Sequence, residues 1–363
     1  MAESPTVRFN NSNRQFYAEL RKRVDQYFRE KQISKNGNVN MFAKTIFMFA
    51  AYLVPYSLLI SGVFESRLVW LLLSVLMGLG MAGIGLCVMH DANHGSYSRN
   101  QKLNKILGYV SMNIIGGFSL NWRIQHNVIH HTYTNVHEHD EDIAPPGFLR
   151  FEPHAEKKWI HRFQFIYAWF FYGMMTLMWS TTKDFRQLWR YYRKGHLKAA
   201  NTTLAKELWI LIASKSLYHL FMLLPYFVVP GMSFLEWLAG FLVIHYIAGL
   251  GLAMIFQPAH VVAETEFYVP DQNGSIENNW AEHQMRTTNN FATSDPVFSW
   301  LVGGLNYQVE HHLFPTICHV HYPKISKIVE TTAREFNVPY NRHRTWAGAL
   351  WSHQRMLWRL GRA

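Results

Sequence analysis

Long apolar runs separated by polar segments dominate the pattern of this 363-residue chain. Five runs reach or approach the ~20 residues that a helix needs to cross the hydrocarbon core of a bilayer. The first two runs are joined by Glu65-Ser66-Arg67 and the last two by Pro230-Gly231-Met232-Ser233, so each pair must form a tight hairpin. The pattern therefore predicts an all-α integral membrane protein. The five runs are residues 45–64, 68–89, 163–180, 208–229 and 234–256.

The N-terminal segment, residues 1–43, is polar and charged and contains one amphipathic stretch. Between residues 14 and 31 four apolar side chains recur at i, i+4, i+8 and i+12, which places them on one face of a helix. They are Phe16, Leu20, Val24 and Phe28. We expect a cytosolic N-terminal amphipathic region over residues 1–43, packed on a polar cap, and a single membrane domain over residues 44–363.

Basic residues are distributed unevenly along the chain, which carries a formal net charge of +11. The two hairpin links hold a single basic residue, Arg67, whereas the N-terminus, the segment 183–206 and the C-terminal hundred residues are rich in Lys and Arg. By the positive-inside rule both termini face the cytoplasm. No basic soluble module stands apart, so we expect no nucleic-acid partner. The basic run 183–206 is interpreted as a solvated face, although such residues can also hold an anionic head group.

Histidines gather in three tight clusters next to the apolar runs. In two clusters the spacing is i, i+4, which lets both imidazoles share one face of a helix and reach the same metal. The clustered residues are His90, His94, His126, His130, His131, His311 and His312. The two cysteines are too few for a thiolate site, so the ligands must be nitrogen and oxygen. Isolated histidines such as His219 and His245 are interpreted as ordinary hydrogen-bonded residues.

The number of imidazoles exceeds the three or four protein ligands of one tetrahedral zinc and suits two first-row ions. Imidazole serves Fe, Cu, Zn and Ni alike, so the ligand type does not choose the metal. If the clusters build one site, an even number of crossings must separate the second cluster from the third. Three runs lie between them, and we expect the aromatic-rich run 163–180 to lie in the membrane interface. The prediction is four transmembrane helices, about 45–64, 68–89, 208–229 and 234–256, with interfacial helices and a cytosolic helical cap of 90–207 and 257–363.

The three clusters resemble the histidine boxes of the membrane-bound fatty acyl desaturases, an integral-membrane di-iron family. The boxes are H-x3-H at His90–His94, H-x3-H-H at His126–His131 and Q-x2-H-H at Gln308–His312. The longer strings that match family blocks are HDANHGSYS, QHNVIHHTYTN and GGLNYQVEHHLFP, and the likeness runs from the first span to about Pro323. A Gln that opens the third box resembles the front-end branch, which desaturates between an existing double bond and the carboxyl end. The fused cytochrome b5 domain of many front-end enzymes, with its His-Pro-Gly-Gly, is not found in this sequence.

The resemblance implies a ligand set. The family draws a further histidine from just beyond the last span, where His260 stands in Phe256-Gln-Pro-Ala-His260, with His283 as the rival. The expected metal ligands are His90, His94, His126, His130, His131, His260, His311 and His312. Asp91, Asn93 and Gln308 are expected just outside them, orienting imidazoles or holding a water. Asp140, Glu141 and Asp142 can do the same, but we interpret them as a solvated acidic loop. The sequence assigns no substrate-binding residue.

The resemblance also implies the reaction. Two iron ions, O2 and two external electrons remove two hydrogens from an acyl chain, carried by CoA or by a lipid, leaving a cis double bond and water. The electrons are expected from a separate cytochrome b5 or ferredoxin with its reductase. The protein is expected in the bacterial inner membrane, or in the endoplasmic reticulum if eukaryotic. Alternatives are an acyl or sphingolipid hydroxylase on the same scaffold, a membrane zinc hydrolase, and a metal transporter.

Overall fold

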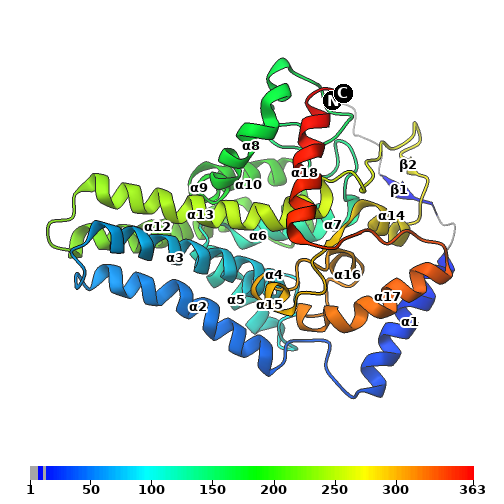
Figure 1. The fold of residues 1–363 in the computed structure, drawn as a ribbon, viewed down its shortest axis with the longest axis horizontal. Helices are drawn as coiled ribbons and strands as arrows, with labels where there is room; N and C mark the ends of the chain where they lie inside the picture. Colours follow the sequence, from blue (N-terminus) through cyan, green and yellow to red (C-terminus); the bar gives the residue numbers. More distant parts are fainter. Residues whose placement is uncertain (1–6, 11–13) are drawn as a thin grey trace. The chain divides into compact units, whose positions relative to one another are not determined.

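The computed structural model describes residues 7–10 and 14–363, and it is mostly helical (Figure 1). Four helices among the described residues are long and apolar enough to cross a membrane, as predicted. They are α2 (Val39–Ile60), the continuous helix Arg67–Asn93, α12 (Leu204–Val228) and α13 (Phe234–His260). The helix Arg67–Asn93 consists of α3 (Arg67–Gly83), the π-helix η1 (Ile84–Met89) and α4 (His90–Asn93).

The chain divides into two compact units, one of which contains most of the apolar helices. This second unit comprises residues 39–124 and 169–253. In it α2 packs against α3 (Figure 1). Hydrogen bonds from Tyr218 to His245 and from Trp237 to the Met222 carbonyl join α12 and α13. The first helix starts at Val39 and stops at Ile60, earlier than the run 45–64, because Gly62 turns the chain with a φ of 67°. Shorter helices of this unit are α5 (Gln101–Ile114), α6 (Ser119–Arg123), α9 (Met175–Met178), α10 (Asp184–Arg193) and α11 (His196–Ala199).

The aromatic run 163–180 does not form one long helix. It is divided among η3 (Trp159–Phe163), α8 (Gln164–Gly173), α9 and the π-helix η4 (Trp179–Lys183). None of these described elements has the length of a span.

A buried ion pair explains how Lys215 is accommodated in the apolar helix α12. Its ammonium lies 2.5 Å from the Asp184 carboxylate, with both side chains almost fully buried. The same group also donates to the carbonyls of Gly116 and Trp179, each at 2.7 Å. All three ammonium hydrogens therefore have acceptors, which a buried cation requires. The pair fixes the start of α10 against the middle of α12.

The first unit comprises residues 1–38, 125–168 and 254–363. In it α1 (Arg14–Glu30) packs on α17 (Tyr322–Glu335) (Figure 1), and the predicted apolar stripe of α1 is buried. Strand β1 (Arg8–Phe9) pairs in parallel with β2 (Ser275–Ile276), and β3 (Asn290–Phe291) pairs in parallel with β4 (Arg342–His343). The remaining elements are η2 (Ile124–His130), α7 (His131–Tyr133), α14 (Trp280–Thr287), α15 (Pro296–Leu301), α16 (Gln308–Leu313), η5 (His319–His321) and α18 (Trp346–Leu360).

Candidate metal centre

The second histidine box begins on a π-helix, η2, which holds His126 and His130, while His131 is the first residue of α7. Over η2 the backbone winds with i→i+5 hydrogen bonds, so residues five apart come to lie above one another. His126 and His131 have exactly that separation, and their Nε2 atoms are 3.3 Å apart. The α-helical i, i+4 spacing pairs His126 with His130 instead. The π-helical winding therefore places the imidazole of His131 next to that of His126.

The third box lies on the short helix α16 and brings two adjacent imidazoles to the second box. The ring of His131 is 4.5 Å from that of His311 and 4.3 Å from that of His312, between ring centres. Potential ligand atoms of these three side chains all lie within 4.8 Å of one another. All three side chains are buried. Boxes two and three therefore form one cluster within the first unit.

His260, at the end of α13, belongs to the same cluster. Its ring centre is 4.7 Å from that of His130 and 4.8 Å from that of His312, and the three residues form a second group of potential ligands. The rival, His283, bonds the Thr134 carbonyl through Nε2 at 2.7 Å. It joins no group of three potential ligands among residues 7–10 and 14–363. The geometry supports His260 over His283.

The first box lies in the second unit, at the end of the helix that begins at Arg67. The ring centres of His90 and His94 are 4.7 Å apart, and the Trp122 ring meets each of them edge-on at 5.6 Å. The Asn93 amide donates to the Met89 carbonyl and accepts from the Ser119 hydroxyl, so it ties this helix to α6. These two bonds are structural, and neither orients an imidazole as expected for Asn93.

The surroundings of His130 differ from the expected solvated acidic loop. Asp140 is buried, and its carboxylate oxygens lie 3.0 and 3.1 Å from His130 Nδ1. The same carboxylate accepts the backbone N–H groups of Asn135 and Asp142, each at 2.9 Å. A carboxylate on Nδ1–H fixes the tautomer and leaves Nε2 to bind a metal. The interpretation of a solvated loop is therefore wrong for Asp140. The loop folds back so that this carboxylate contacts His130 of the second histidine box.

Two further orienting side chains could not be found from the sequence. The Gln284 carbonyl oxygen, on α14, is 2.8 Å from His312 Nδ1 and also accepts from the Thr134 hydroxyl at 2.9 Å. The Tyr322 hydroxyl, at the start of α17, is 3.2 Å from His311 Nδ1. Neither residue belongs to a histidine box, and only the packing of helices brings them there. The expected Gln308 donates to the Leu305 carbonyl at 2.7 Å.

Buried charged groups beside the second box shift one another's pKa values. Burial disfavours a charged His130, but Asp140 and Asp142 outweigh it and raise the pKa of His130 to about 9. Burial also disfavours the Asp142 carboxylate, yet the charge on His130 and hydrogen bonds from His126 and Gln125 hold its pKa well below the usual range. These carboxylates stabilise one positive charge at His130. Burial and the charge on His130 lower the pKa of the neighbouring His260 to about 3. A metal cation held by His130 would take the place of its proton beside the same carboxylates.

The donor set fits transition-metal ions. It consists of buried imidazoles in overlapping groups of three, with carboxylate and amide acceptors behind them. Fe, Cu, Zn and Ni accept such ligands, whereas Mg and Ca prefer oxygen. The features define a polyhistidine metalloprotein with candidate membrane-spanning helices.

Comparison with known proteins narrows this class. The sequence model of the fatty acid desaturase family matches residues 65–344, and the chain belongs to that family. The sn-1 linoleoyl-lipid 6-desaturase of Arthrospira platensis is 36% identical over 340 residues, 92% of this chain and 89% of the relative. The protein of the same name from Synechocystis sp. is 36% identical over 369 residues, 100% of both chains. The acyl-lipid (8-3)-desaturase of Physcomitrium patens is 36% identical over 96% of this chain and 72% of its own.

The membership predicted from the histidine boxes is confirmed, and the relatives' names agree with the front-end branch. The protein is an oxidoreductase that desaturates acyl chains.

Proposed function

We propose that this protein is a di-iron front-end desaturase that inserts a cis double bond into an acyl chain of a membrane glycerolipid. The observation that carries the substrate class is the 36% identity, over 100% of both chains, to a relative named for a lipid-linked acyl group and a 6-desaturation. An acyl chain carried by CoA is the competing substrate. The front-end position is supported by Gln308, which opens the third box.

The proposed ligands are eight imidazoles that hold two iron ions. Six of them lie in the first unit, and the resemblance of the first histidine box to the family adds His90 and His94 to the proposed set. The six are His126, His130, His131, His260, His311 and His312. Bound iron supplies the O2-dependent oxidation of an unactivated methylene, for which no side chain is strong enough. Gln308 is proposed to hold a water beside the metal, and Asp91 to orient a ligand of the first box.

The chain's own residues prepare this site. Asp140, Gln284 and Tyr322 each engage the Nδ1 atom of one ligand, so that the Nε2 atoms converge without rotation of the rings. The six imidazoles of the first unit are buried, which keeps bulk water away from the reacting carbon. These bonds make the ligand set rigid before iron arrives, which favours binding.

The proposed topology places four spans in the bilayer with both termini and all boxes in the cytoplasm. The two hairpin links, with Glu65, Arg67 and Glu236 nearby, would face the opposite side. A cytosolic region over residues 1–43 would precede the membrane domain, and the run 163–180 would lie in the interface. O2 and a separate cytochrome b5 or ferredoxin, with its reductase, would supply the oxidant and electrons. The membrane would be a bacterial inner membrane or the endoplasmic reticulum.

The test combines product and metal in one preparation. The full chain is expressed in a host that supplies linoleoyl lipids, and the sn-1 chains are released and examined for a new cis double bond at the front-end position. We expect about two irons per chain, and loss of product in His311→Ala but not in His154→Ala, an exposed histidine outside the cluster. Hydroxylated acyl chains as the product would show a hydroxylase instead. One zinc per chain, with activity in the absence of O2, would show a hydrolase.

A further inference from the structure

The C-terminal helix α18 carries large apolar side chains on its exposed side. Trp351 is 64% exposed and Trp358 is 47% exposed, and their i, i+7 spacing places them on one face of the helix. The other face is already packed, since Ala349, Leu357 and Leu360 are buried. The two tryptophans are therefore additional apolar surface that the packing of α18 does not use.

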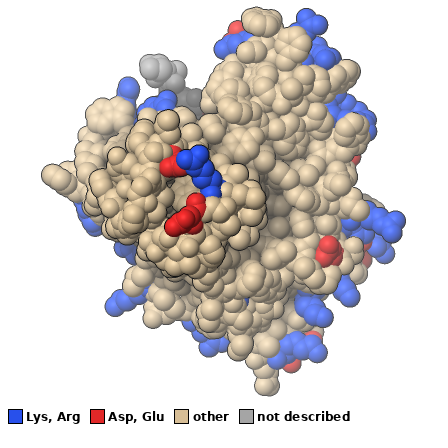
Figure 2. Space-filling model, turned by 60° about the vertical axis from the view of Figure 1, so that its left-hand side comes forward, with Lys and Arg blue, Asp and Glu red and all other residues tan. Residues whose placement is uncertain are grey.

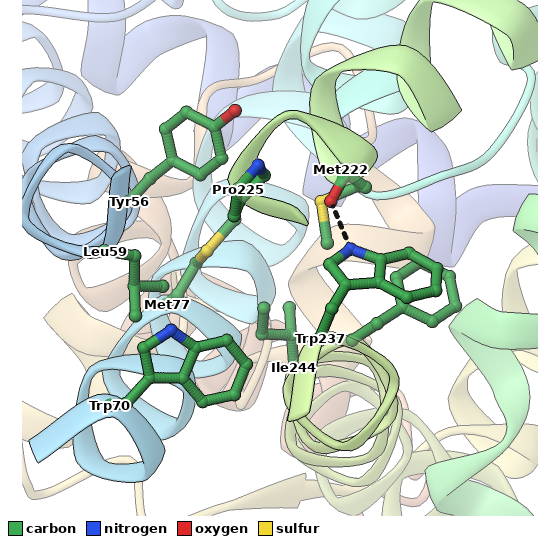
Figure 3. Close-up of a pocket in the computed structure, with 9 residues that line it drawn as sticks. Tyr56, Leu59, Trp70, Met77, Met222, Pro225, Trp237 and Ile244 are labelled. Carbon is green, nitrogen blue, oxygen red and sulfur yellow. Dashed lines mark hydrogen bonds between the residues drawn. The ribbon is translucent and has the colours of Figure 1, made fainter. Parts of the chain in front are cut away.

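Tryptophans of the second unit are placed differently. Trp70 and Trp237 turn their rings toward side chains of neighbouring helices (Figure 3). The Trp237 indole also donates to a backbone carbonyl of α12 at 2.7 Å. Packing against other helices accounts for these two rings. It does not account for Trp351 and Trp358, which leave about half or more of each side chain open at the surface.

The exposed apolar surface continues from α18 onto η3 and the start of α8. Trp159, Phe163 and Ile166 are 78%, 45% and 63% exposed. The Arg362 guanidinium connects the two regions, because its carbon lies 4.3 Å from the centre of the Trp358 ring and 5.3 Å from that of the Phe165 ring. Large exposed apolar patches mark surfaces that contact a protein or a membrane. We call this set the apolar face of the first unit: Trp159, Phe163, Ile166, Trp351 and Trp358.

Helix α18 is fixed to the end of α13. The Trp346 indole, at the first residue of α18, donates to the Met254 carbonyl in the last two turns of α13 at 3.0 Å. One turn further along α18, His353 Nδ1 lies 2.8 Å from the Val261 carbonyl, just after α13 ends. These are the residues at which the proposed fourth span leaves the hydrocarbon. Tryptophan is enriched at this level of a bilayer.

The charge beside the apolar face is positive. Residues 336–363 contain five arginines and no Asp or Glu. Arg355 and Arg359 are exposed on α18 beside the two tryptophans. Lysines and arginines also outnumber acids at the margins of the face drawn in Figure 2. A surface of this charge complements the phosphate groups of anionic lipids.

Helix α1, in the same unit, shows what a water-facing helix of this chain looks like. Its apolar stripe is buried, and its other side mixes both signs of charge. Arg23 pairs with Glu19 at 2.8 Å, and Lys35 pairs with Asp25 at 2.6 Å. Helix α18 has tryptophans and arginines where α1 has paired charges. This combination is typical of helices that lie in a membrane interface.

We propose that the apolar face of the first unit, with Arg355 and Arg359, binds the anionic head-group layer of the bilayer that α13 enters. The apolar side chains reach the boundary between head groups and acyl chains, and the two arginines pair with lipid phosphates. A soluble protein that docks through Trp and Arg would use the same residue types. The attachment of α18 to the end of α13 favours the lipid. The proposal rests on the span of α13 in the proposed topology and is independent of the reaction.

A spin label shows what covers α18. Ala347 is exposed one turn before Trp351, and Cys87 and Cys318 are buried, so the label attaches to the variant Ala347→Cys. The labelled full-length protein is placed in nanodiscs of phosphatidylcholine and phosphatidylglycerol. Electron paramagnetic resonance then measures collisions with O2, which dissolves in lipid, and with a water-soluble nickel complex. At residue 347 we expect frequent collisions with O2 and few with nickel.

Two further labels define the limits of this scale. Ala18→Cys, on the exposed side of α1, gives the values for water, and Leu242→Cys, exposed on α13, gives the values for hydrocarbon. Nickel access at residue 347 equal to that at residue 18 would overturn the proposal and would leave this face to a soluble partner. Nickel access at residue 242 would instead contradict the span of α13, and with it the proposed topology.

The double variant Arg355→Gln with Arg359→Gln tests the preference for anionic lipid. A phosphatidylglycerol with a diazirine in its head group is added at low mole fraction, and after illumination the label on residues 345–359 is measured by mass spectrometry. Each lost arginine should lower this labelling about fivefold, the usual contribution of one basic residue near an anionic surface. The control is Arg21→Gln with Arg29→Gln, the same charge change at exposed positions of α1, which should label like the unmodified chain.

Equal labelling of the α18 and α1 double variants would overturn the proposal. So would equal labelling by phosphatidylcholine that carries the same probe. Thermal unfolding checks that each variant is folded, and all the substituted side chains are exposed. Desaturation is measured on the same nanodiscs. Its absence would contradict the proposed function and leave the lipid contacts of α18 unaffected.

Discussion

At the scale of single residues, the metal centre depends on groups that do not contact the metal. Asp140 is the clearest case, because it is buried and accepts from His130 Nδ1 and from two backbone N–H groups. Nothing in the run Asp140-Glu141-Asp142 distinguishes the first carboxylate from its neighbours. Its burial results from a turn that places the carboxylate back against the π-helix.

Asp140→Ala should weaken iron binding by about 10–100-fold, the usual effect of removing the acceptor behind a ligating imidazole. The imidazole of His130 would then be free to rotate or to change its tautomer. The iron content that remains after dialysis against a series of chelator concentrations measures the change in affinity. Glu141→Ala is the control from the same loop, and an unchanged affinity in Asp140→Ala would show that His130 is not a ligand or needs no support.

His353 gives a prediction about pH. Burial lowers the pKa of its imidazole to about 4, and its Nδ1 lies 2.8 Å from the Val261 carbonyl. The unfolded chain takes up this proton below about pH 6.5 and the folded chain only below about 4, so stability should fall by up to roughly 3 kcal/mol between these values. Above pH 6.5 both states are neutral and the group has no effect.

His353→Gln should therefore lose stability less steeply between pH 6.5 and 4 than the unmodified chain. The midpoint of thermal unfolding in detergent, measured at several pH values, gives the slope. His154→Gln, at an exposed position, serves as the control. Parallel pH profiles for all three proteins would contradict the lowered pKa.

At the scale of elements, hydrophobic pattern and helix period predicted much of the structure. The four apolar helices and the stripe on α1 were predictable because each depends on residues close together in sequence. The π-helical winding of η2 was not, since no local pattern separates i→i+5 from i→i+4 hydrogen bonds. The contacts of Gln284 and Tyr322 were not predictable either, because they depend on how α14 and α17 approach α16.

Lys215 shows how one element can depend on another. Lys215→Met removes the cation and leaves the Asp184 carboxylate buried without its charge partner, which should destabilise the fold by about 3–5 kcal/mol. The double variant Lys215→Met with Asp184→Asn should regain much of this loss, because no charge stays buried. Thermal unfolding of the detergent-purified proteins measures both. A double variant no more stable than the single one would mean that the hydrogen bonds, not the charges, hold α10 to α12.

At the scale of the molecule, metal binding should stabilise the two units unequally. Six of the eight proposed ligands lie in the first unit, on the short helices η2, α7 and α16 and at the end of α13. The apolar helices of the second unit are stabilised by their own packing. Binding to the folded state alone stabilises it by an amount that grows with the logarithm of the ratio of metal concentration to dissociation constant.

Removal of iron should therefore increase hydrogen exchange around residues 126–142 and 280–313 and leave 39–60 and 204–228 close to their protected state. Exchange followed by mass spectrometry, before and after chelation, gives the comparison. The variant His311→Ala, measured without chelator, removes one proposed ligand and gives a second test of the same comparison. A uniform increase over all segments would show that the metal supports the whole chain as one cooperative unit.

The N-terminal helix has a consequence for biosynthesis. The Tyr17 hydroxyl donates to the Leu313 carbonyl, 296 residues later, and β1 pairs with residues 275–276. The ribosome therefore releases one partner of these contacts at the beginning of translation and the other near its end. The six imidazoles of the first unit come from residues 126–312, on both sides of two apolar helices, and meet only after α12, α13 and the third box have been synthesised. Loading of the proposed iron would therefore follow synthesis of the third box, because a chain that stalls before this box lacks His311 and His312.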